Sequence, residues 1–287
     1  MQTKKIQLTR TTTSHKGQCG RLGIIAGSAH YTGAVILATQ AAFRCGIGSV
    51  TIFSVKAVTT MIQTTCPEAI AISVSDQTHL SQQNWPKLLN HIRQQQIEGL
   101  IIGPGLGRHP DTQSLVNLIL SEQWQTPLPC VIDADAINAL QHDTLSKLNA
   151  ITGILTPHHG EFETLIQQKI TNRQHQLATA TQNHSHVIIL KGAGTLVAQN
   201  KNKIYQNKSG NPGMAVAGMG DVLSGCIGSL MLQNLSPFEA SCIGVYTHGK
   251  AGDLAFNKYH IGLTPSDVIN YLPEALADFV TITPKIN

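Results

Sequence analysis

The segment Asn211–Gly225 combines many small residues with one carboxylate, Asp221, at the point where an apolar helix is predicted to begin. Glycines let backbone N–H groups approach an anion closely, and the N-terminus of a helix adds a favourable dipole. A carboxylate beside such an anion cradle is well placed to act as a general base. Asp221 could instead only cap the helix, but a cap alone does not require so many small residues before it.

A second glycine-rich turn, Leu190–Thr195, follows a predicted strand that ends at Lys191. It fits a tight hairpin turn as well as it fits a backbone clamp on nucleotide phosphates, in which Lys191 would supply positive charge. The chain contains no G-x-x-x-x-G-K-[ST] segment, so it is not a P-loop protein. Gly103–Gly107 does not open a full G-x-G-x-x-G fingerprint, which disfavours a simple Rossmann oxidoreductase.

Further polar residues follow other predicted strands. In Thr156–Glu161 two histidines are adjacent, and adjacent residues do not share one face of a helix, so no zinc site is expected there. His158 is a candidate for ligand contact at a strand end, although a structural role fits it too. Asp135 is expected to cap the following helix, and Asp133 is a candidate for orienting a ligand or metal-bound water. For His248, helix packing or a helix end is favoured over catalysis.

Regular elements must bring these loops together, and the sequence alternates short β-rich runs with longer helical patterns. This alternation predicts βαβ units in an α/β fold, with a largely parallel central sheet and helices on both faces. Ligands of open α/β sheets bind beyond the carboxyl ends of the strands, where the polar loops fall. We expect a helix over Gly33–Cys45, an exposed helix within Ser81–Glu98, a hairpin over Thr195–Gln206 and a mostly helical chain from Asp221 onward. The predicted strands are Arg21–Ala26, Ser49–Ser54, Ala69–Val74, Gly99–Ile102, Cys130–Asp133, Ile151–Leu155 and His186–Leu190.

Length and composition fit one folded domain over residues 1–287, with 41% hydrophobic and 13% charged residues; residues 1–14 are expected to form a mobile N-terminal segment. The net charge is +4, and no basic run resembles a nucleic-acid arm. No apolar run reaches the ~18 residues that cross a membrane, and Met1–Arg10 lacks the apolar core of a secretory signal. Six cysteines without C-x-x-C spacing predict reduced, buried thiols and therefore a cytoplasmic protein.

Taken together, the loops resemble the ADP-dependent NAD(P)H-hydrate dehydratase family, a branch of the ribokinase-like superfamily. The resemblance implies an enzyme that removes water from hydrated NADH or NADPH, which cannot donate hydride, and so restores the normal cofactor. ADP, or ATP in some members, would drive the reaction with Mg²⁺, through a phosphorylated hydrate. The order and spacing of the matching segments are more specific than any single motif; they are His15–Gly17, Gly27–Ala34, Gly103–Gly107, Asp133–Asn138, Thr156–Glu161, Lys191–Thr195 and Gly218–Gly225.

The resemblance also implies roles for individual residues. Asp221 would be the catalytic base, taking the proton of the ring hydroxyl as that hydroxyl attacks the terminal phosphate. The adenine nucleotide would be held by Lys191, Gly192, Ala193, Gly194, Thr195 and Gly220. The binding site for the hydrate would be lined by Ala34, Gly105 or Gly107, His158 and Asp221. The chain departs from the family where paired glycines and a Thr usually stand, which are here Ala217, Gly218 and Met219, and at Ala26, where the first strand often ends in Gly.

The resemblance further implies a homo-oligomer, often a tetramer among relatives. The chain lacks room for the epimerase domain that some relatives carry, so a separate epimerase protein is expected to act in the same pathway. One alternative is a small-molecule kinase of the same superfamily that acts on a vitamin precursor, disfavoured by Gly27–Ala34 and Thr156–His158. A second is a nucleotide sensor that has lost turnover, against which the intact Asp221 argues.

Overall fold

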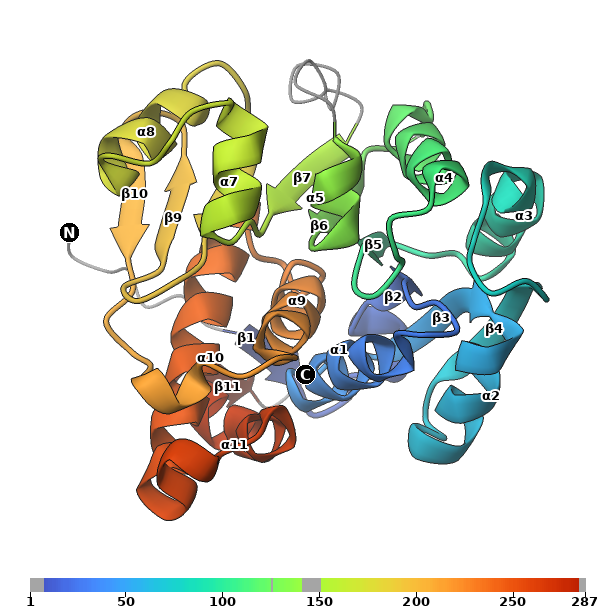
Figure 1. Cartoon of the computed structure of the whole chain (residues 1–287). Coiled ribbons are helices and arrows are strands. Elements are labelled where there is room, and N and C mark those ends of the chain that lie inside the picture. The colour runs from blue at the N-terminus through green and yellow to red at the C-terminus, as the bar shows by residue number, and fades with distance from the viewer. Residues whose placement is uncertain (1–7, 125, 141–150, 284–287) are drawn as a thin grey trace.

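A nine-stranded sheet forms the centre of the protein, whose computed structural model describes residues 8–124, 126–140 and 151–283 (Figure 1). The strands lie in the order β10-β9-β8-β7-β6-β5-β2-β3-β4, and every pair from β8 to β4 is parallel. Only β9 and β10 are antiparallel additions at one edge. The strands are β2 (Arg21–Ile25), β3 (Ser49–Val55), β4 (Ile70–Ser75), β5 (Gly99–Ile102), β6 (Leu128–Ile132), β7 (Ile151–Leu155), β8 (Val187–Leu190), β9 (Leu196–Gln199) and β10 (Lys203–Gln206).

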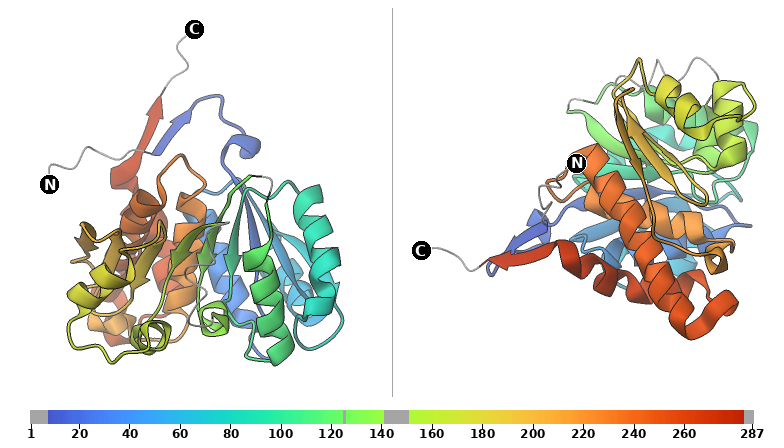
Figure 2. Two further views of the ribbon diagram at one scale, coloured as in Figure 1. Left: turned by 90° about the horizontal axis from the view of Figure 1, so that it is seen from above. Right: turned by 90° about the vertical axis from the view of Figure 1, so that its left-hand side faces the viewer.

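Helices cover both faces of this sheet (Figures 1 and 2). One layer contains α3 (Trp85–Gln94), α4 (Pro110–Ser121), α5 (Asp135–Ala139), α7 (His159–Ile166) and α8 (Arg173–Ala180). The other contains α1 (Thr32–Arg44), α2 (Lys56–Thr65), α9 (Met219–Leu230), α10 (Pro237–Tyr259) and α11 (Pro265–Leu276). The predicted α/β class, with a largely parallel sheet covered on both faces, is confirmed.

Residue size explains how the second layer packs. All four residues of β5 are buried, as expected for a central parallel strand covered on both faces. Helix α9 lies directly against α1, and small residues allow the close approach. A Cβ placed on Gly225 would lie 2.2 Å from the carbonyl oxygen of Ala38, so only glycine fits this crossing. The small residues of α9 therefore serve helix packing as well as the loop before it.

The predicted elements agree closely with the structure. The strands are found within two residues of their predicted starts, and the predicted helix Gly33–Cys45 is α1. The expected hairpin is formed by β9 and β10, and the chain beyond Asp221 is mostly helical. The helix expected within Ser81–Glu98 is α3, which buries Leu88 and Ile92.

One feature of the fold was not predicted. Strand β1 (Leu8–Thr11) pairs in parallel with β11 (Val280–Thr283), forming a separate two-stranded sheet beside the main body (Figure 2). Residues 8–11 thus form a paired strand inside the segment predicted to be mobile, while residues 1–7 lie outside the described part of the chain. The sequence near residue 280 carries no turn signal that would separate a short strand from the preceding helix.

Two further expectations concern the thiols and the membrane. All six cysteines are free and, except for half-buried Cys242, buried, as predicted from their spacing. Burial raises the pKa of the Cys130 thiol to about 12, so this thiol stays protonated and unreactive. Among the described residues, no helix has the length and apolar character needed to cross a membrane.

Candidate active site

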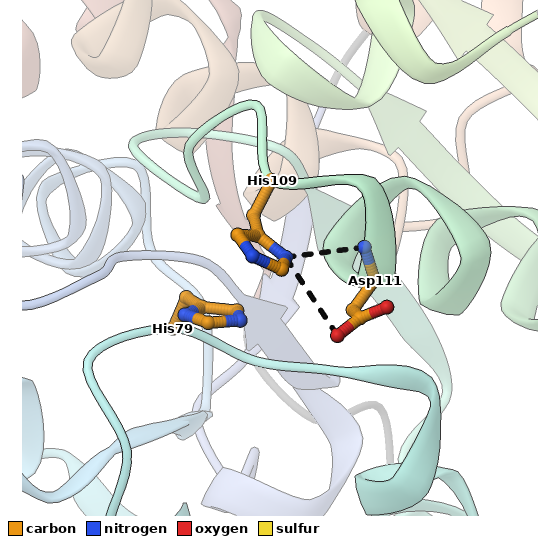
Figure 3. Close-up of side chains that lie close together, drawn as sticks. All are labelled: His79, His109 and Asp111. Atoms are coloured by element: carbon orange, nitrogen blue, oxygen red, sulfur yellow. Dashed lines mark hydrogen bonds and ion pairs between the residues drawn. The ribbon is translucent and has the colours of Figure 1, made fainter.

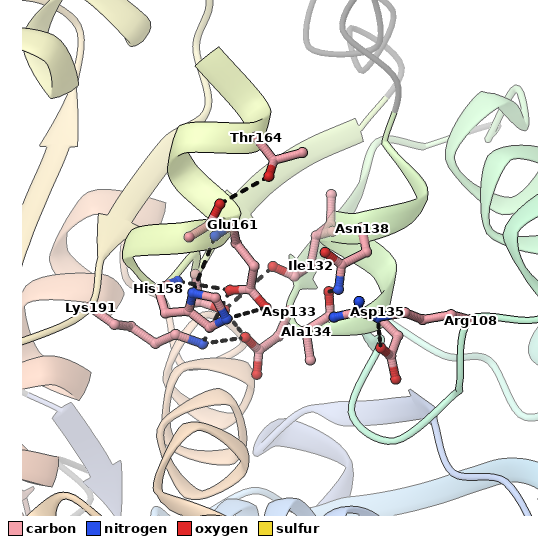
Figure 4. Close-up of polar contacts among 12 residues, drawn as sticks. Arg108, Ile132, Asp133, Ala134, Asp135, Asn138, His158, Glu161, Thr164 and Lys191 are labelled. Atoms are coloured by element: carbon pink, nitrogen blue, oxygen red, sulfur yellow. Dashed lines mark hydrogen bonds and ion pairs between the residues drawn. The ribbon is translucent and has the colours of Figure 1, made fainter. Parts of the chain in front are cut away.

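The predicted site residues lie beyond the carboxyl ends of β2, β5, β7 and β8 and at the start of α9. Asp133 follows β6 and is 1% exposed. Its Oδ1 lies 2.8 Å from Nζ of Lys191, which follows β8, and accepts a 2.6 Å hydrogen bond from the Thr156 hydroxyl. Its Oδ2 accepts a 2.6 Å hydrogen bond from the Ser224 hydroxyl on α9. The Asp133 carboxylate is thus held from three elements, and Figure 4 shows Lys191 reaching it.

This ion pair determines the charge of the site. Burial alone would raise the pKa of Asp133, but the charge and hydrogen bond of Lys191, with the two hydroxyl donors, lower it overall. Burial alone would lower the pKa of Lys191, but Asp133 and Glu161 raise it. The Glu161 carboxylate lies 4.0 Å from Lys191 Nζ. Lys191 therefore carries a full positive charge near neutral pH, largely balanced by its neighbours.

Asp221 lies in the first turn of α9, but it does not cap that helix. The N-cap residue is Gly218, whose φ of 96° is in the left-handed region that favours glycine, and no side chain provides a cap. The carboxylate of Asp221 forms no hydrogen bond or ion pair with any described residue. Burial and then the negative charge of Asp133 raise its pKa to about 7, with a smaller contribution from Asp135, and the positive charge of Lys191 opposes this rise only in part. The capping interpretation of Asp221 is wrong.

The loop that leads from Lys191 to β9 has an unusual backbone. Gly192 has a φ of 137°, and a conformation of this kind is accessible mainly to glycine. The side chain of Arg173, on α8, fastens the loop: its Nη1 donates to the Ala193 carbonyl at 2.8 Å, and its Nη2 to the Leu190 carbonyl at 3.3 Å. No sequence motif pointed to Arg173, because its partners are backbone carbonyls of a loop distant in the chain.

Two cavities open beside these groups. The first, of about 930 Å³, is lined by the Lys191–Thr195 loop, Gly220 and the Asn207–Met219 segment. The second, of about 840 Å³, is lined by Ala34, Gly105 and Gly107. Ala217, Gly218 and Asp221 line both cavities. Asp221 therefore stands where the two cavities meet, and the first is large enough for a nucleotide.

The structure divides the predicted residues between the cavities with one difference. All six predicted nucleotide residues line the first cavity, and four of the five predicted hydrate residues, Asp221 among them, line the second. His158 lines the first cavity instead. Its Nδ1 accepts a 3.2 Å hydrogen bond from the Glu161 N–H, and its own N–H donates to the Glu161 carboxylate at 2.8 Å, so His158 also caps α7.

Asp135 differs from its predicted role as a helix cap. It is the first residue of α5, whose N-cap is Ala134. Its carboxylate accepts a 2.9 Å hydrogen bond from the Gly107 N–H and lies 3.6 Å from Nε of Arg108 (Figure 4). Asp135 therefore fixes the glycine loop that lines the second cavity.

His248 lies in the middle of α10 and lines the first cavity. The sequence favoured only helix packing or a helix end for this residue. Burial and the charge of Lys191 lower its pKa to about 4, so its ring is neutral near pH 7. Its Nε2 is buried without a hydrogen-bond partner among the described residues. His248 therefore contributes a neutral ring to the cavity wall.

Ala217, Met219 and Ala26, where the chain departs from the family pattern, cause no backbone strain. None of the three has a positive φ, so a β-carbon is accommodated without strain at each. The glycine that the conformation does require, Gly218, is present. Met219 is 7% exposed and Ala26 is fully buried.

The largely parallel sheet, covered by helices on both faces, has the ribokinase-like α/β fold: a ribokinase-like superfamily protein of Enterococcus faecalis superimposes with a TM-score of 0.78 at 28% identity, over 96% of this chain and 92% of that one. The family model described as NAD(P)H-hydrate dehydratase matches residues 22–274, and the chain belongs to this family.

Individual relatives agree with the family. The chain is 35% identical over 258 residues to an ADP-dependent (S)-NAD(P)H-hydrate dehydratase of Neisseria meningitidis, covering 85% of this chain and 80% of that protein. It is 37% identical over 279 residues to a bifunctional NAD(P)H-hydrate repair enzyme of Moorella thermoacetica, covering 93% of this chain but 51% of that protein. The chain thus spans about half the length of the bifunctional relatives it matches.

A solved structure is similar as well. An ADP/ATP-dependent NAD(P)H-hydrate dehydratase of Bacillus subtilis, co-crystallised with ATP and Mg²⁺, superimposes with a TM-score of 0.76 at 27% identity. The match covers 94% of this chain and 93% of that one.

Proposed function

We propose that this protein uses ADP or ATP to dehydrate hydrated NADH or NADPH and so returns the normal reduced cofactor. The observation that supports this best is the position of Asp221, a carboxylate at the junction of two cavities that has no hydrogen-bond partner in the described part of the chain. A reaction that joins a nucleotide to a second molecule needs two adjoining spaces and one reacting point between them. Family membership and the ADP-dependent relative supply the substrate class.

The chemistry assigned to the site is a phosphoryl transfer followed by an elimination. Asp221 takes the proton of the hydrate's ring hydroxyl, whose oxygen attacks the terminal phosphorus of the nucleotide and displaces AMP from ADP, or ADP from ATP. The ring then loses inorganic phosphate together with a ring proton, and the double bond re-forms. The nucleotide is needed because it converts the hydroxyl into a phosphate, which leaves more easily than hydroxide.

The first cavity would hold the nucleotide. Lys191 and the backbone of Gly192–Thr195 would bind phosphate oxygens, with Gly220 next to Lys191: a Cβ there would lie 3.4 Å from Lys191 Nζ. Backbone N–H groups at the start of α9 would stabilise negative charge that develops on the transferred group. His158 is assigned to this cavity on its position, in place of the hydrate contact expected from the sequence.

The second cavity would hold the hydrate against Ala34, Gly105 and Gly107, with its hydroxyl toward Asp221. A pKa of about 7 suits Asp221 for this task, because a general base works best when its pKa lies near the working pH.

The oxygen atoms at the site and on the nucleotide phosphates suit Mg²⁺. It prefers oxygen ligands and keeps several waters when it binds with substrate phosphates. Asp133 is engaged by Lys191 and two hydroxyls and Asp221 is assigned as the base, so the ion would be held chiefly by the nucleotide phosphates and by water in the first cavity. Such an ion supplies neutralisation of phosphate charge.

The remaining parts of the proposal follow from the family. We infer a homo-oligomer, a tetramer by resemblance, that acts in the cytoplasm in the same pathway as an epimerase; the relatives of twice the matched length are bifunctional repair enzymes. Size-exclusion chromatography with light scattering measures the oligomeric state directly.

The test is an assay with NADH hydrate made in acid, incubated with ADP and Mg²⁺ while the absorbance of the reduced nicotinamide is followed. We expect the absorbance to return with the parent protein and to return far more slowly with Asp221→Asn. The assay is repeated with ATP and with NADPH hydrate. Failure of every combination to restore absorbance would overturn the proposal. Phosphorylation of a vitamin precursor would then favour a small-molecule kinase, and tight nucleotide binding without turnover a sensor.

A further inference from the structure

A cluster of metal-binding side chains lies outside both cavities. His79, in the loop after β4, and His109, in the loop before α4, stack with ring centroids 3.9 Å apart and 30° between their planes. Asp111, in the first turn of α4, completes the group. One ligand atom from each of the three residues lies within 4.8 Å of the other two (Figure 3).

The backbone fixes these two loops against each other. The Thr112 hydroxyl, at the start of α4, donates a 2.5 Å hydrogen bond to the carbonyl of Leu80, next to His79, and both residues are buried. Pro110 and the residues around it begin α4 directly after His109, so the imidazole is carried by a helix end. The two histidines are therefore held near each other by buried contacts, although their own rings face solvent.

A structural role explains only part of the cluster. Nδ1 of His109 accepts a 3.2 Å hydrogen bond from the Asp111 N–H and so caps α4. His79 has no comparable role: among the described residues, its only hydrogen-bond partner is the neighbouring Thr78 hydroxyl, at 3.3 Å. A second imidazole stacked on the cap, with a carboxylate beside both, remains unexplained by helix capping.

We propose that His79, His109 and Asp111 form a binding site for a divalent transition-metal ion such as Zn²⁺. Two imidazole nitrogens and one carboxylate oxygen are ligands that Zn²⁺ accepts, and three protein ligands leave a fourth position for water. This site is separate from the Mg²⁺ of the proposed reaction, which would accompany the nucleotide phosphates.

The required movement is small. Bonds of about 2.1 Å at tetrahedral angles separate neighbouring ligand atoms by ~3.3 Å. The present separations of up to 4.8 Å must therefore shrink by no more than ~1.5 Å. The side chains of His109 and Asp111 are 49% and 53% exposed, so rotation about their side-chain bonds meets little obstruction. The ion would replace the Asp111 N–H at Nδ1 of His109, or bind the ring through its other nitrogen.

The site also touches the second cavity through the backbone. The carbonyl of Thr78 accepts a 2.8 Å hydrogen bond from the N–H of Ala29, which belongs to the loop that carries His30 and Tyr31 at that cavity. Arg108, immediately before His109, lines the same cavity. Zn²⁺ would thus join two loops that both continue into the cavity wall.

The experiment is a calorimetric titration of the metal-free parent with Zn²⁺ near neutral pH, repeated with His79→Ala and Asp111→Asn. A matched control is His175→Ala, which removes an exposed histidine on α8. Co²⁺ is then bound in place of Zn²⁺, because its visible absorption reports the number of ligands. Circular dichroism of each variant checks that the fold is kept.

We expect one Zn²⁺ per chain whose affinity falls at least ~10-fold in both cluster variants, the loss expected for removal of a metal-binding group, and stays unchanged in the control. The Co²⁺ spectrum of the parent should show four- or five-coordination that His79→Ala abolishes. Equal Zn²⁺ affinity in the parent and His79→Ala, or loss of affinity in His175→Ala alone, would refute the site. Neither outcome depends on dehydratase activity.

Discussion

Asp221→Asn separates the effect of this carboxylate on stability from its role in catalysis. The substitution keeps the size of the side chain and removes its charge, and Gly218 rather than Asp221 forms the cap of α9. No hydrogen bond or ion pair among the described residues is lost. We therefore expect the variant to fold, to be more stable than the parent above neutral pH, and to be nearly inactive.

The size of the stabilisation follows from the pKa of Asp221. Its rise from 3.8 to about 7 corresponds to ~4 kcal/mol between the two protonation states. The folded protein binds this proton more tightly than the unfolded chain, so the contribution of Asp221 to the free energy of unfolding falls as pH rises from about 4 to about 7. Between pH 5 and pH 8 the advantage of Asn should grow by ~2.5 kcal/mol at most, and by ~1 kcal/mol once partial solvent access is considered.

Urea unfolding of both proteins at pH 5 and pH 8 measures this difference, with Asp76→Asn on an exposed loop as the control. An advantage of Asn that does not grow with pH would refute the idea that burial and like charges strain Asp221. In the same preparations, turnover of NADH hydrate should fall ~10²-fold or more. Its rate in the parent should rise with pH through about 7, because the base must be deprotonated. A stable variant that keeps parental turnover would exclude Asp221 as the base.

Three further changes test the surrounding structure. Lys191→Met should lower the free energy of unfolding by ~3–5 kcal/mol in urea, because it leaves the Asp133 carboxylate buried without its partner, and should weaken ADP binding in calorimetry. His186, 1% exposed with a pKa lowered to about 4, must be neutral in the fold, so its own contribution to stability should fall as pH drops from about 6.5 toward 4, and the melting temperature of His186→Leu should gain on that of the parent over this range. Gly225→Ala should cost ~2 kcal/mol or more by forcing α1 and α9 apart, whereas Gly33→Ala, which meets nothing within 4 Å, should be neutral or slightly stabilising in the same urea titration.

Local sequence pattern was sufficient for most of the fold. Central parallel strands such as β5 are short continuous apolar runs, and α1 and α3 show helical spacing, so both kinds of element are visible without tertiary information. Strand β11 was missed because four residues of β-prone sequence after a helix become a strand only through pairing with β1, more than 260 residues away. Such pairing leaves no local signal.

The site was predicted in its parts but not in its electrostatics. Glycine loops and the carboxylate before an apolar helix are sequence features, and they correctly indicated the edge of the sheet where the cavities lie. The pairing of Lys191 with Asp133 joins residues 58 positions apart, and a separation of 28 positions hides the role of Asp135 in holding Gly107. Arg173 and His248 were missed for the same reason, since each acts on backbone or cavity contributed by another segment.

The reactivity assigned to Asp221 arises from what its neighbours do with their charges. Lys191 binds Asp133 at 2.8 Å, and its effect on the pKa of Asp221 is smaller than the opposite effects of burial and of Asp133. Were that pair absent, the same ammonium would be free to pair with Asp221 and lower its pKa, which would make it a poorer base near pH 7. The hydroxyls of Thr156 and Ser224 keep Asp133 ionised and the pair closed. The buried ion pair therefore holds Lys191 beside the first cavity while it leaves Asp221 strained, unpartnered and able to accept a proton.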